Sequence, residues 1–187
     1  MTIEESPIKG CFVIQPSVFE DHRGYFYESF NQKLLDEALG YSPQFVQDNQ
    51  SQSSYGVLRG LHLQIGKWAQ AKLIRAVEGQ ILDVVVDVRI DSPQFGEHFS
   101  MELSAENKQQ IFLPRGFAHG FAVLSDKATI HYKADNYYNK ESESGLLYND
   151  PKLNIDWQVP SEAIITSEKD LVLPDLVKFR EVLEANN

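Results

Sequence analysis

The chain has 187 residues, of which 42% are hydrophobic and 24% are charged, which is enough to bury the core of one domain and argues against intrinsic disorder. The formal net charge of −10 disfavours a general nucleic-acid-binding protein, although a few local cations still suffice to bind a diphosphate. Because Cys11 is the only cysteine, no intrachain disulfide can form, and we expect a small core residue there. Neither a secretion signal nor a membrane-spanning run is visible, so we expect a cytoplasmic protein with a single domain over residues 1–187.

The expected elements are mostly strands. Asn31 can cap a first helix over Gln32–Leu39, with Gly40 ending it. Alternating apolar residues then predict strands at Ala71–Val77, Ile81–Ile90, Gln109–Leu113 and Ala128–Lys133, and a last helix is expected over Asp175–Ala185. In Ile81–Ile90 one face is apolar and the other is mixed, which predicts a strand buried on one side. Many strands at short spacing, separated by turn signals, indicate a mainly β sandwich or barrel with a few short peripheral helices.

One histidine stands out in the segment from Gly56 to Gln64. His62 lies on a predominantly apolar run, three residues after Arg59, and a polar stretch over residues 47–54 precedes the run. A buried titratable group usually has a partner or a task. The pattern therefore points to proton transfer on a polar, anionic small molecule, although a histidine on a strand can also be a hydrogen-bonded core residue.

Three ionisable side chains are expected to share the interior of the barrel. Alternate residues of a barrel strand point inward, and His62, Lys72 and Tyr132 each belong to a different expected strand. Burying such groups is costly without a purpose. Taken singly, a lysine such as Lys72 is more often a solvated edge residue, and a tyrosine such as Tyr132 is more often a packing residue with its hydroxyl at the surface.

The segment Pro114–Phe121 carries a Pro-x-Gly-x-x-His pattern that ends at His119. It resembles the second motif of the cupin superfamily of small β-barrels, in which that histidine often binds a metal. The His-x-His pair of the first cupin motif is absent here, because Leu63 and Gln64 follow His62. A transition-metal site needs three or more good ligands. We therefore expect no metal, and His119 is expected to bind a ligand or a neighbouring side chain.

An ordered set of motifs gives a more specific resemblance. In chain order it comprises Asp21–Phe30, Gln47–Asn49, Gly56–Gln64, Gln70–Leu73, Ser92–Gly96, Gly116–Phe121, Tyr132–Lys133, Tyr137–Tyr138, Glu143–Gly145, Asn149–Pro151 and Ile155–Trp157. In this order the chain resembles the dTDP-4-dehydrorhamnose 3,5-epimerase family, whose members are cupin-type jelly rolls. The resemblance covers residues 3–175.

The resemblance implies a reaction without cofactor or metal. The substrate is dTDP-4-dehydro-6-deoxy-D-glucose, which is epimerised at C3 and C5, the two carbons beside the ketone. The carbonyl makes the protons on these carbons acidic, so a base can remove one to give an enolate, and a proton returned to the opposite face inverts the centre.

By motif position, the resemblance assigns catalytic roles to four side chains. His62 matches the base, Tyr132 matches the acid on the far face, and Lys72 matches a cation that stabilises the enolate oxygen. Asp170 matches the carboxylate that holds the other imidazole nitrogen, with Asp83 as the alternative partner of His62.

Further matches concern binding of the nucleotide sugar. The implied contacts are Arg23, Phe26, Glu28, Gln47, Asp48, Asn49, Arg59, His119, Tyr138, Glu143 and Lys169. Phe26 and Tyr138 are candidates for stacking on thymine, with simple packing as the alternative. The resemblance also implies a homodimer in which an arm of the neighbouring subunit completes the site, and the polar segment Asp21–Glu28 is the candidate arm.

Three other functions remain open from the sequence. The first is a mono-epimerase that inverts only one carbon of another dTDP-deoxysugar, because such relatives share nearly all of these residues. The second is a metal-dependent cupin oxygenase, and the third is a non-catalytic module that binds nucleotide sugars. A pure binding module has no need for a base, an acid and a cation together, which argues for an enzyme.

Overall fold

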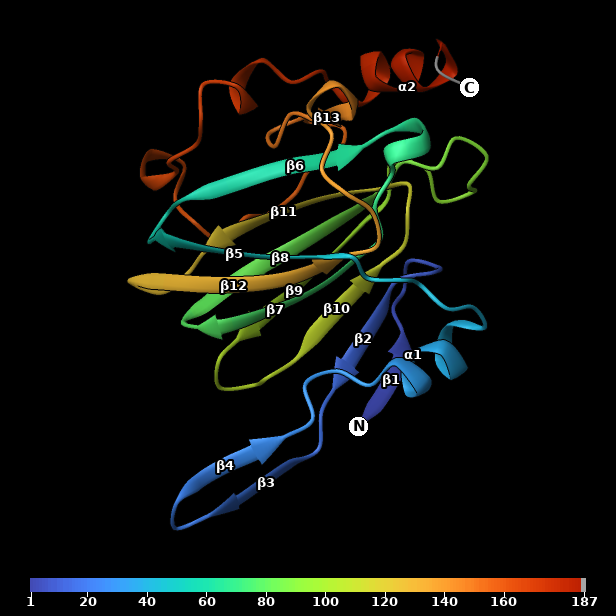
Figure 1. The fold of residues 1–187 in the computed structure, drawn as a ribbon. Helices are drawn as coiled ribbons and strands as arrows, with labels where there is room; N and C mark the ends of the chain where they lie inside the picture. The colour runs from blue at the N-terminus through green and yellow to red at the C-terminus, as the bar shows by residue number, and fades with distance from the viewer. Residues whose placement is uncertain (186–187) are drawn as a thin grey trace.

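The computed structural model describes residues 1–185, and two antiparallel sheets packed face to face form its body (Figure 1). In spatial order, the six-stranded sheet contains β1 (Thr2–Glu5), β2 (Phe12–Gln15), β10 (Gln110–Leu113), β7 (Lys72–Glu78), β12 (Lys127–Ala134) and β5 (Gln47–Ser54). The five-stranded sheet contains β13 (Glu143–Gly145), β6 (Leu58–Gln64), β11 (Phe117–Val123), β8 (Gln80–Asp87) and β9 (His98–Ser104). The expectation of a mainly β jelly-roll sandwich with few helices is confirmed.

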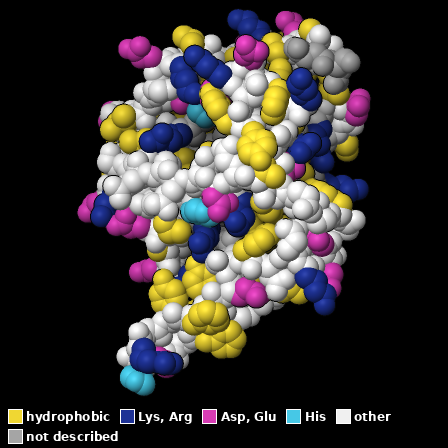
Figure 2. Space-filling model, viewed as in Figure 1, with side chains coloured by type: hydrophobic (Ala, Val, Ile, Leu, Met, Phe, Trp, Pro, Cys, Tyr) yellow, Lys and Arg dark blue, Asp and Glu magenta, His cyan; other side chains and the backbone are white. Residues whose placement is uncertain are grey.

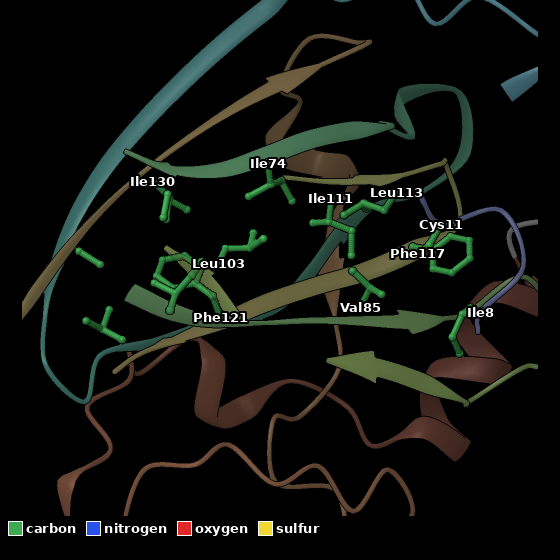
Figure 3. Close-up of a cluster of buried hydrophobic side chains, with 14 residues drawn as sticks. Ile8, Cys11, Ile74, Val85, Leu103, Ile111, Leu113, Phe117, Phe121 and Ile130 are labelled. Atoms are coloured by element: carbon green, nitrogen blue, oxygen red, sulfur yellow. The ribbon is translucent and has the colours of Figure 1, made fainter. Parts of the chain in front are cut away.

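The main core lies between the two sheets (Figure 3). Its side chains come from both sheets, and fourteen of them are drawn, including Ile74, Val85, Phe117 and Phe121. Cys11 belongs to this core and is fully buried, so its thiol acts as a small apolar side chain, as expected. Phe121 of this core also lines the cavity described below.

A second core lies on the outer face of the five-stranded sheet, beneath the C-terminal segment and α2 (Leu176–Ala185), which cover that sheet in Figure 1. Trp157 and Phe179 pack there against Val84 and Val86 of β8. The expectation that the strand within Ile81–Ile90 is buried on one face only was therefore wrong. Every residue from Ile81 to Asp87 is buried, because the interior covers one face and the C-terminal segment covers the other.

The strand β8 also ends earlier than its alternation predicts. The Asp87 carboxylate accepts hydrogen bonds from Arg89 and from the Ser92 hydroxyl. These bonds favour a turn after Asp87, since short polar side chains compete with strand pairing by bonding to local groups. Arg89 and Ile90 consequently lie outside the strand.

The helices match their sequence signals. α1 spans Gln32–Leu39, with the Asn31 side chain accepting from the Leu34 N–H and Gly40 in the left-handed conformation at φ +75°. α1 packs Leu35 onto the outer face of the six-stranded sheet. The last helix begins at Leu176 rather than at Asp175, because the Asp175 carboxylate accepts from the Lys178 N–H and so acts as its cap. Short 3₁₀ turns occupy Gly66–Trp68, Lys140–Ser142, Ser161–Ala163 and Asp170–Val172.

A hairpin projects from the body (Figure 1). It consists of β3 (Val18–Asp21) and β4 (Gly24–Tyr27), which form a separate two-stranded sheet. Phe19, Tyr25 and Phe26 on it are 66%, 60% and 71% exposed, and hydrophobic side chains gather along it in Figure 2. No helix within residues 1–185 is long and apolar enough to span a membrane. The last two residues of the expected domain 1–187 lie outside the described part of the chain.

Candidate active site

A cavity of about 630 Å³ opens between the two sheets. Its walls come from β5, β6, β7, β11 and β12, and residues 165–170 of the C-terminal segment close one side. His62, Lys72 and Tyr132 all line it, as the strand alternation predicts. Three different strands, β6, β7 and β12, therefore bring three ionisable groups into one cavity.

A bulge in β6 lets two of its polar residues face the cavity. His62 pairs with His119 and Arg59 with Phe121, so three steps along β6 match two along β11. At the bulge, Gly60 has a φ of +121°, and a Cβ there would lie 2.6 Å from the Gly120 Cα. Because only glycine fits this close approach, the sequence Arg-Gly-Leu-His brings both Arg59 and His62 to the cavity.

His62 has a carboxylate partner from a distant part of the chain. Its Nε2 lies 2.7 Å from the Asp170 Oδ1, and the Gly60 N–H donates to the Asp170 Oδ2 at 3.5 Å. The Asp170 side chain is only 3% exposed and that of His62 is 25% exposed. Burial lowers the pKa of His62 below its usual value, and the nearby Asp170 partly offsets this shift. The imidazole is therefore neutral at neutral pH and is held in one orientation.

A second pair of the same kind lies deeper. The His119 Nε2 is 2.8 Å from the Asp83 Oδ2, on the neighbouring strands β11 and β8. The Asp83 side chain is fully buried, and its Oδ1 has no hydrogen-bond partner. Its negative charge acts on Lys72, whose pKa is lowered by burial to about 8 despite the opposing attraction of Asp83 and Glu143. Lys72 thus remains largely protonated at neutral pH.

Tyr132 lies beside this lysine. The Lys72 Nζ is 5.8 Å from the centroid of the Tyr132 ring. Burial raises the pKa of the phenol, so Tyr132 keeps its proton at neutral pH. A neutral imidazole, a protonated phenol and an ammonium group in one cavity can remove a proton, return one and stabilise an intervening oxyanion.

The polar groups at the cavity mouth form a connected network. The Tyr138 hydroxyl donates to Glu143 at 3.0 Å, and the Lys169 ammonium donates to the same carboxylate at 2.7 Å. On the other side, Gln47 accepts from the Tyr138 N–H and donates to Asn49. Arg59 donates to the Ser53 hydroxyl at 3.1 Å. The mouth therefore offers cations, amides and one aromatic ring to a polar ligand.

Comparison with known proteins identifies the family. The family model described as dTDP-4-dehydrorhamnose 3,5-epimerase matches residues 5–178. The chain is 56% identical to a crystal structure of dTDP-4-dehydrorhamnose 3,5-epimerase from Elizabethkingia anophelis, with a TM-score of 0.92 and coverage of 95% of this chain and 97% of that one. The chain belongs to this epimerase family.

Two further solved structures are similar to this chain at lower identity. A dTDP-6-deoxy-D-glucose-3,5-epimerase from Legionella pneumophila, in complex with dTDP-4-keto-L-rhamnose, is 44% identical with a TM-score of 0.92, covering 97% of this chain and 96% of that one. ChmJ, a 3'-monoepimerase from Streptomyces bikiniensis in complex with dTDP-quinovose, is 31% identical with a TM-score of 0.83, covering 98% of each chain. Of these relatives, the two 3,5-epimerases are the more similar to this chain.

The sequence left two partners open for His62, and the structure separates them. Asp170 lies against His62, whereas Asp83 binds His119. The alternative of an Asp83–His62 pair was therefore wrong. Both carboxylates are close to the cavity, but β8 brings Asp83 next to β11 rather than to β6.

Five of the expected substrate contacts do not line the cavity of this subunit, and one of them, Gln47, instead bonds to the lining residues Asn49 and Tyr138. Asp48 was expected there with Gln47 and Asn49, but strand alternation turns it to the outer face of β5, where Lys133 donates to it at 3.0 Å. The Asp48 side chain therefore does not line this cavity. Arg23, Phe26 and Glu28 lie on or beside the projecting hairpin, where Arg23 pairs with Asp21 and Glu28 accepts from Asn31.

Several residues that line the cavity were not identified from the sequence. Ser51 and Ser53 share the inward face of β5 with Asn49, so the period of two could have identified them. Ser51 lines the cavity directly, whereas Ser53 lies behind it against Arg59. Ile165 and Thr166 also line it, but they lie in an irregular segment without a periodic signal.

Buried polar atoms without partners and metal-ligating side chains bear on what the cavity can bind. In the part of the chain that the structure describes, the buried side-chain atoms without a hydrogen-bond partner are the Asn49 Nδ2, the Asp83 Oδ1 and the Thr166 Oγ1. Two of them belong to cavity-lining residues, and the third belongs to the partner of His119. Across residues 1–185, no three His, Cys, Asp or Glu side chains group closely enough to hold a metal ion.

Proposed function

We propose that the cavity around His62 epimerises dTDP-4-dehydro-6-deoxy-D-glucose at C3 and C5 to dTDP-4-dehydro-L-rhamnose, a step of dTDP-L-rhamnose biosynthesis. The observation that carries this proposal is the pair of His62 and Asp170 in the same cavity as Lys72 and Tyr132. The Asn49 and Thr166 polar atoms without partners support a polar ligand there, since buried polar groups are normally hydrogen-bonded.

His62 serves as the base in this proposal. The substrate protons at C3 and C5 are acidic because the resulting carbanions are delocalised onto the C4 ketone oxygen. With Asp170 accepting the Nε2 proton, the neutral ring presents an unprotonated Nδ1 to the sugar. The base takes the proton from carbon, and the C–H electron pair moves into an enolate.

Lys72 and Tyr132 complete the proposed proton transfer. The Lys72 ammonium stabilises the enolate oxygen electrostatically. The Tyr132 hydroxyl gives its proton to the opposite face of the carbon, which restores the ketone with inverted configuration. Carbon is neither oxidised nor reduced over the whole step, so the chemistry requires no redox cofactor. His62 and Tyr132 then exchange protons with solvent before the second centre reacts.

We also propose that Arg59, His119, Asn49, Gln47, Tyr138, Glu143 and Lys169 bind the nucleotide sugar. Arg59 suits a diphosphate oxygen because a guanidinium donates from a fixed fork. Tyr138 presents a 55% exposed ring for stacking on thymine. The cations of this set bring positive charge to the mouth of a chain whose net charge is −10.

The projecting hairpin supports a homodimer, which we include in the proposal. Arg23, Phe26 and Glu28 are remote from the cavity of their own subunit, and Phe26 is 71% exposed. β5 borders the cavity and is an edge strand with free backbone groups. A second copy that laid its hairpin along this edge would bury the aromatic side chains and bring the three residues to the mouth. The single buried cysteine fits the cytoplasm as the site of action.

Proton NMR of the substrate in deuterated buffer tests the proposal. A double epimerase exchanges the protons at C3 and C5, whereas deuterium at one carbon alone would establish a mono-epimerase. The two 3,5-epimerases are more similar to this chain than ChmJ is, which favours the double reaction. Binding of dTDP without any exchange would establish a binding module. Loss of activity to a chelator, with restoration by iron, would establish a metal-dependent cupin.

The Tyr132→Phe variant gives this assay an internal control. His62 still removes and returns a proton on its own face, so deuterium exchange persists. Inversion fails because the far face has no donor, and net turnover falls about 10²-fold or more. Unchanged inversion in this variant would remove Tyr132 from the proposed mechanism.

A further inference from the structure

Gln64 lies two residues beyond His62 on β6, and its side chain is 5% exposed in the wall of the cavity. Both the nitrogen and the oxygen of its amide group form hydrogen bonds. The Nε2 donates to the Trp68 carbonyl at 2.7 Å and to the Tyr137 carbonyl at 3.1 Å, and the Oε1 accepts from the Asn139 N–H at 2.5 Å. One buried side chain therefore holds two separate segments at the cavity mouth.

Two of these bonds bracket Tyr138. The carbonyl of the preceding residue and the N–H of the following residue both bind the same Gln64 amide, while the Tyr138 N–H binds Gln47 on β5. Tyr138 is 55% exposed and belongs to none of the buried clusters. Since no core packing fixes this ring, its place depends on the bonds to its backbone and on the hydroxyl bond to Glu143.

We propose that Gln64 is a positioning residue that fixes the distance between the proton-transfer site at His62 and the nucleotide contact at Tyr138. The same short part of β6 holds both positions, because His62 and Gln64 lie on one face of this strand. A nucleotide sugar that spans the two positions binds more tightly when the distance between them is already fixed, because less freedom is lost on binding. The inference rests on the proposed function and extends it to a residue that transfers no proton.

The test compares two buried glutamines. In Gln64→Met all three bonds are lost at similar volume, and Tyr138 becomes free to move. Gln110→Met is the matched control, because Gln110 is 2% exposed and ties the Ser29 carbonyl to β10 at 2.8 Å, away from the cavity. We expect the KM for the sugar nucleotide and the Kd for dTDP to rise about five- to tenfold in Gln64→Met. The kcat stays within about twofold, and Gln110→Met changes neither constant.

A double-mutant cycle separates positioning from a general structural role. Calorimetric titration with dTDP is carried out on Gln64→Met, Tyr138→Leu and the double variant. If Gln64 acts through Tyr138, Gln64→Met weakens dTDP binding in the original chain and adds nothing to Tyr138→Leu. Additive effects, or an unchanged Kd in Gln64→Met, would overturn the inference. If Gln64→Met does not fold, Gln64→Glu replaces it, because it keeps the acceptor for Asn139 and loses both donors. Failure of the original chain to bind dTDP would instead overturn the proposed function, and the inference with it.

Discussion

The three histidine–aspartate pairs within residues 1–185 differ in where they face. The pairs His62–Asp170 and His119–Asp83 border the cavity, with nitrogen–oxygen distances of 2.7 and 2.8 Å. The third pair, His131–Asp48, lies on the outer face of the six-stranded sheet at 3.6 Å, with Asp48 53% exposed. The same two residue types thus form a pair that is partly exposed at His62, a pair that is buried at His119 and a pair that is open to solvent at Asp48.

The difference between the two cavity pairs indicates a division of labour. Asp170 comes from the irregular C-terminal segment, 108 residues from His62, and leaves the imidazole 25% exposed toward the cavity. Asp83 and His119 lie on adjacent strands, 9% exposed or less. A base must reach its substrate, whereas a buried charge acts through its field. Under the proposed function, the first pair therefore carries out proton transfer, whereas Asp83 of the second pair supports the positive charge of Lys72.

The largest predicted effect distinguishes the two histidines. His62→Ala removes the base and should lower the rate of deuterium exchange at both carbons about 10⁴-fold. His119→Ala should lower it only about 10²-fold, as expected for loss of a polar contact. Circular dichroism should show both variants folded. Equal losses in the two variants would contradict the division of labour, and near-full turnover of His62→Ala would remove it from the role of base.

The next effect concerns Asp170 and the acid limb of the pH profile. His62 acts only when neutral, so kcat falls as pH falls through its pKa, which burial has already lowered. Asp170 opposes this lowering because it favours the protonated ring. Asp170→Asn should therefore move the acid limb to lower pH, and it should reduce kcat about 10²-fold because the ring loses its orienting partner. An acid limb that moves to higher pH would refute this assignment.

Asp83 should act on the opposite limb. Lys72 is useful as a cation, so the rate falls as pH rises through its pKa of about 8. Asp83 supports the charged form, and Asp83→Asn should move the alkaline limb to lower pH. We expect about a threefold loss of kcat at neutral pH and a larger loss above it. The acid limb should stay in place, and a shift of that limb instead would mean that Asp83 acts on His62.

Much of the fold could be predicted because its signals are local. The Asn31 cap and the Gly40 stop gave the limits of α1, and the alternation of apolar residues located β7, β10 and β12 to within one residue. The burial of β8 on both faces could not be predicted. It depends on the C-terminal segment folding back over the sheet, a contact between parts of the chain with no shared local pattern.

The candidate site likewise contains residues that local patterns predict and residues that they do not. Alternation places His62, Lys72 and Tyr132 in one interior, because each lies on a regular strand. Alternation could not predict Asp170, which lies in a 3₁₀ turn, or Arg23, which lies on the projecting hairpin. The motif order suggested Asp170 where periodicity could not. For Asp48 the motif predicts a substrate contact, whereas strand alternation turns its side chain to the outer face, since neighbours on a strand point to opposite faces.

The smallest predicted effect concerns the third pair, His131–Asp48. Asp48→Asn removes the partner of Lys133 and His131 on the outer face. Exposed ion pairs contribute about 1 kcal/mol or less, so the free energy of unfolding should fall by no more than that. Substrate titrations should show kcat and KM within about twofold of the original values, whereas Asn49→Ala, one residue further on the inward face, should raise KM about fivefold through a lost hydrogen bond. A larger KM effect at Asp48 than at Asn49 would mean that the ligand contacts the outer face of β5, and that a histidine–aspartate pair there takes part in binding.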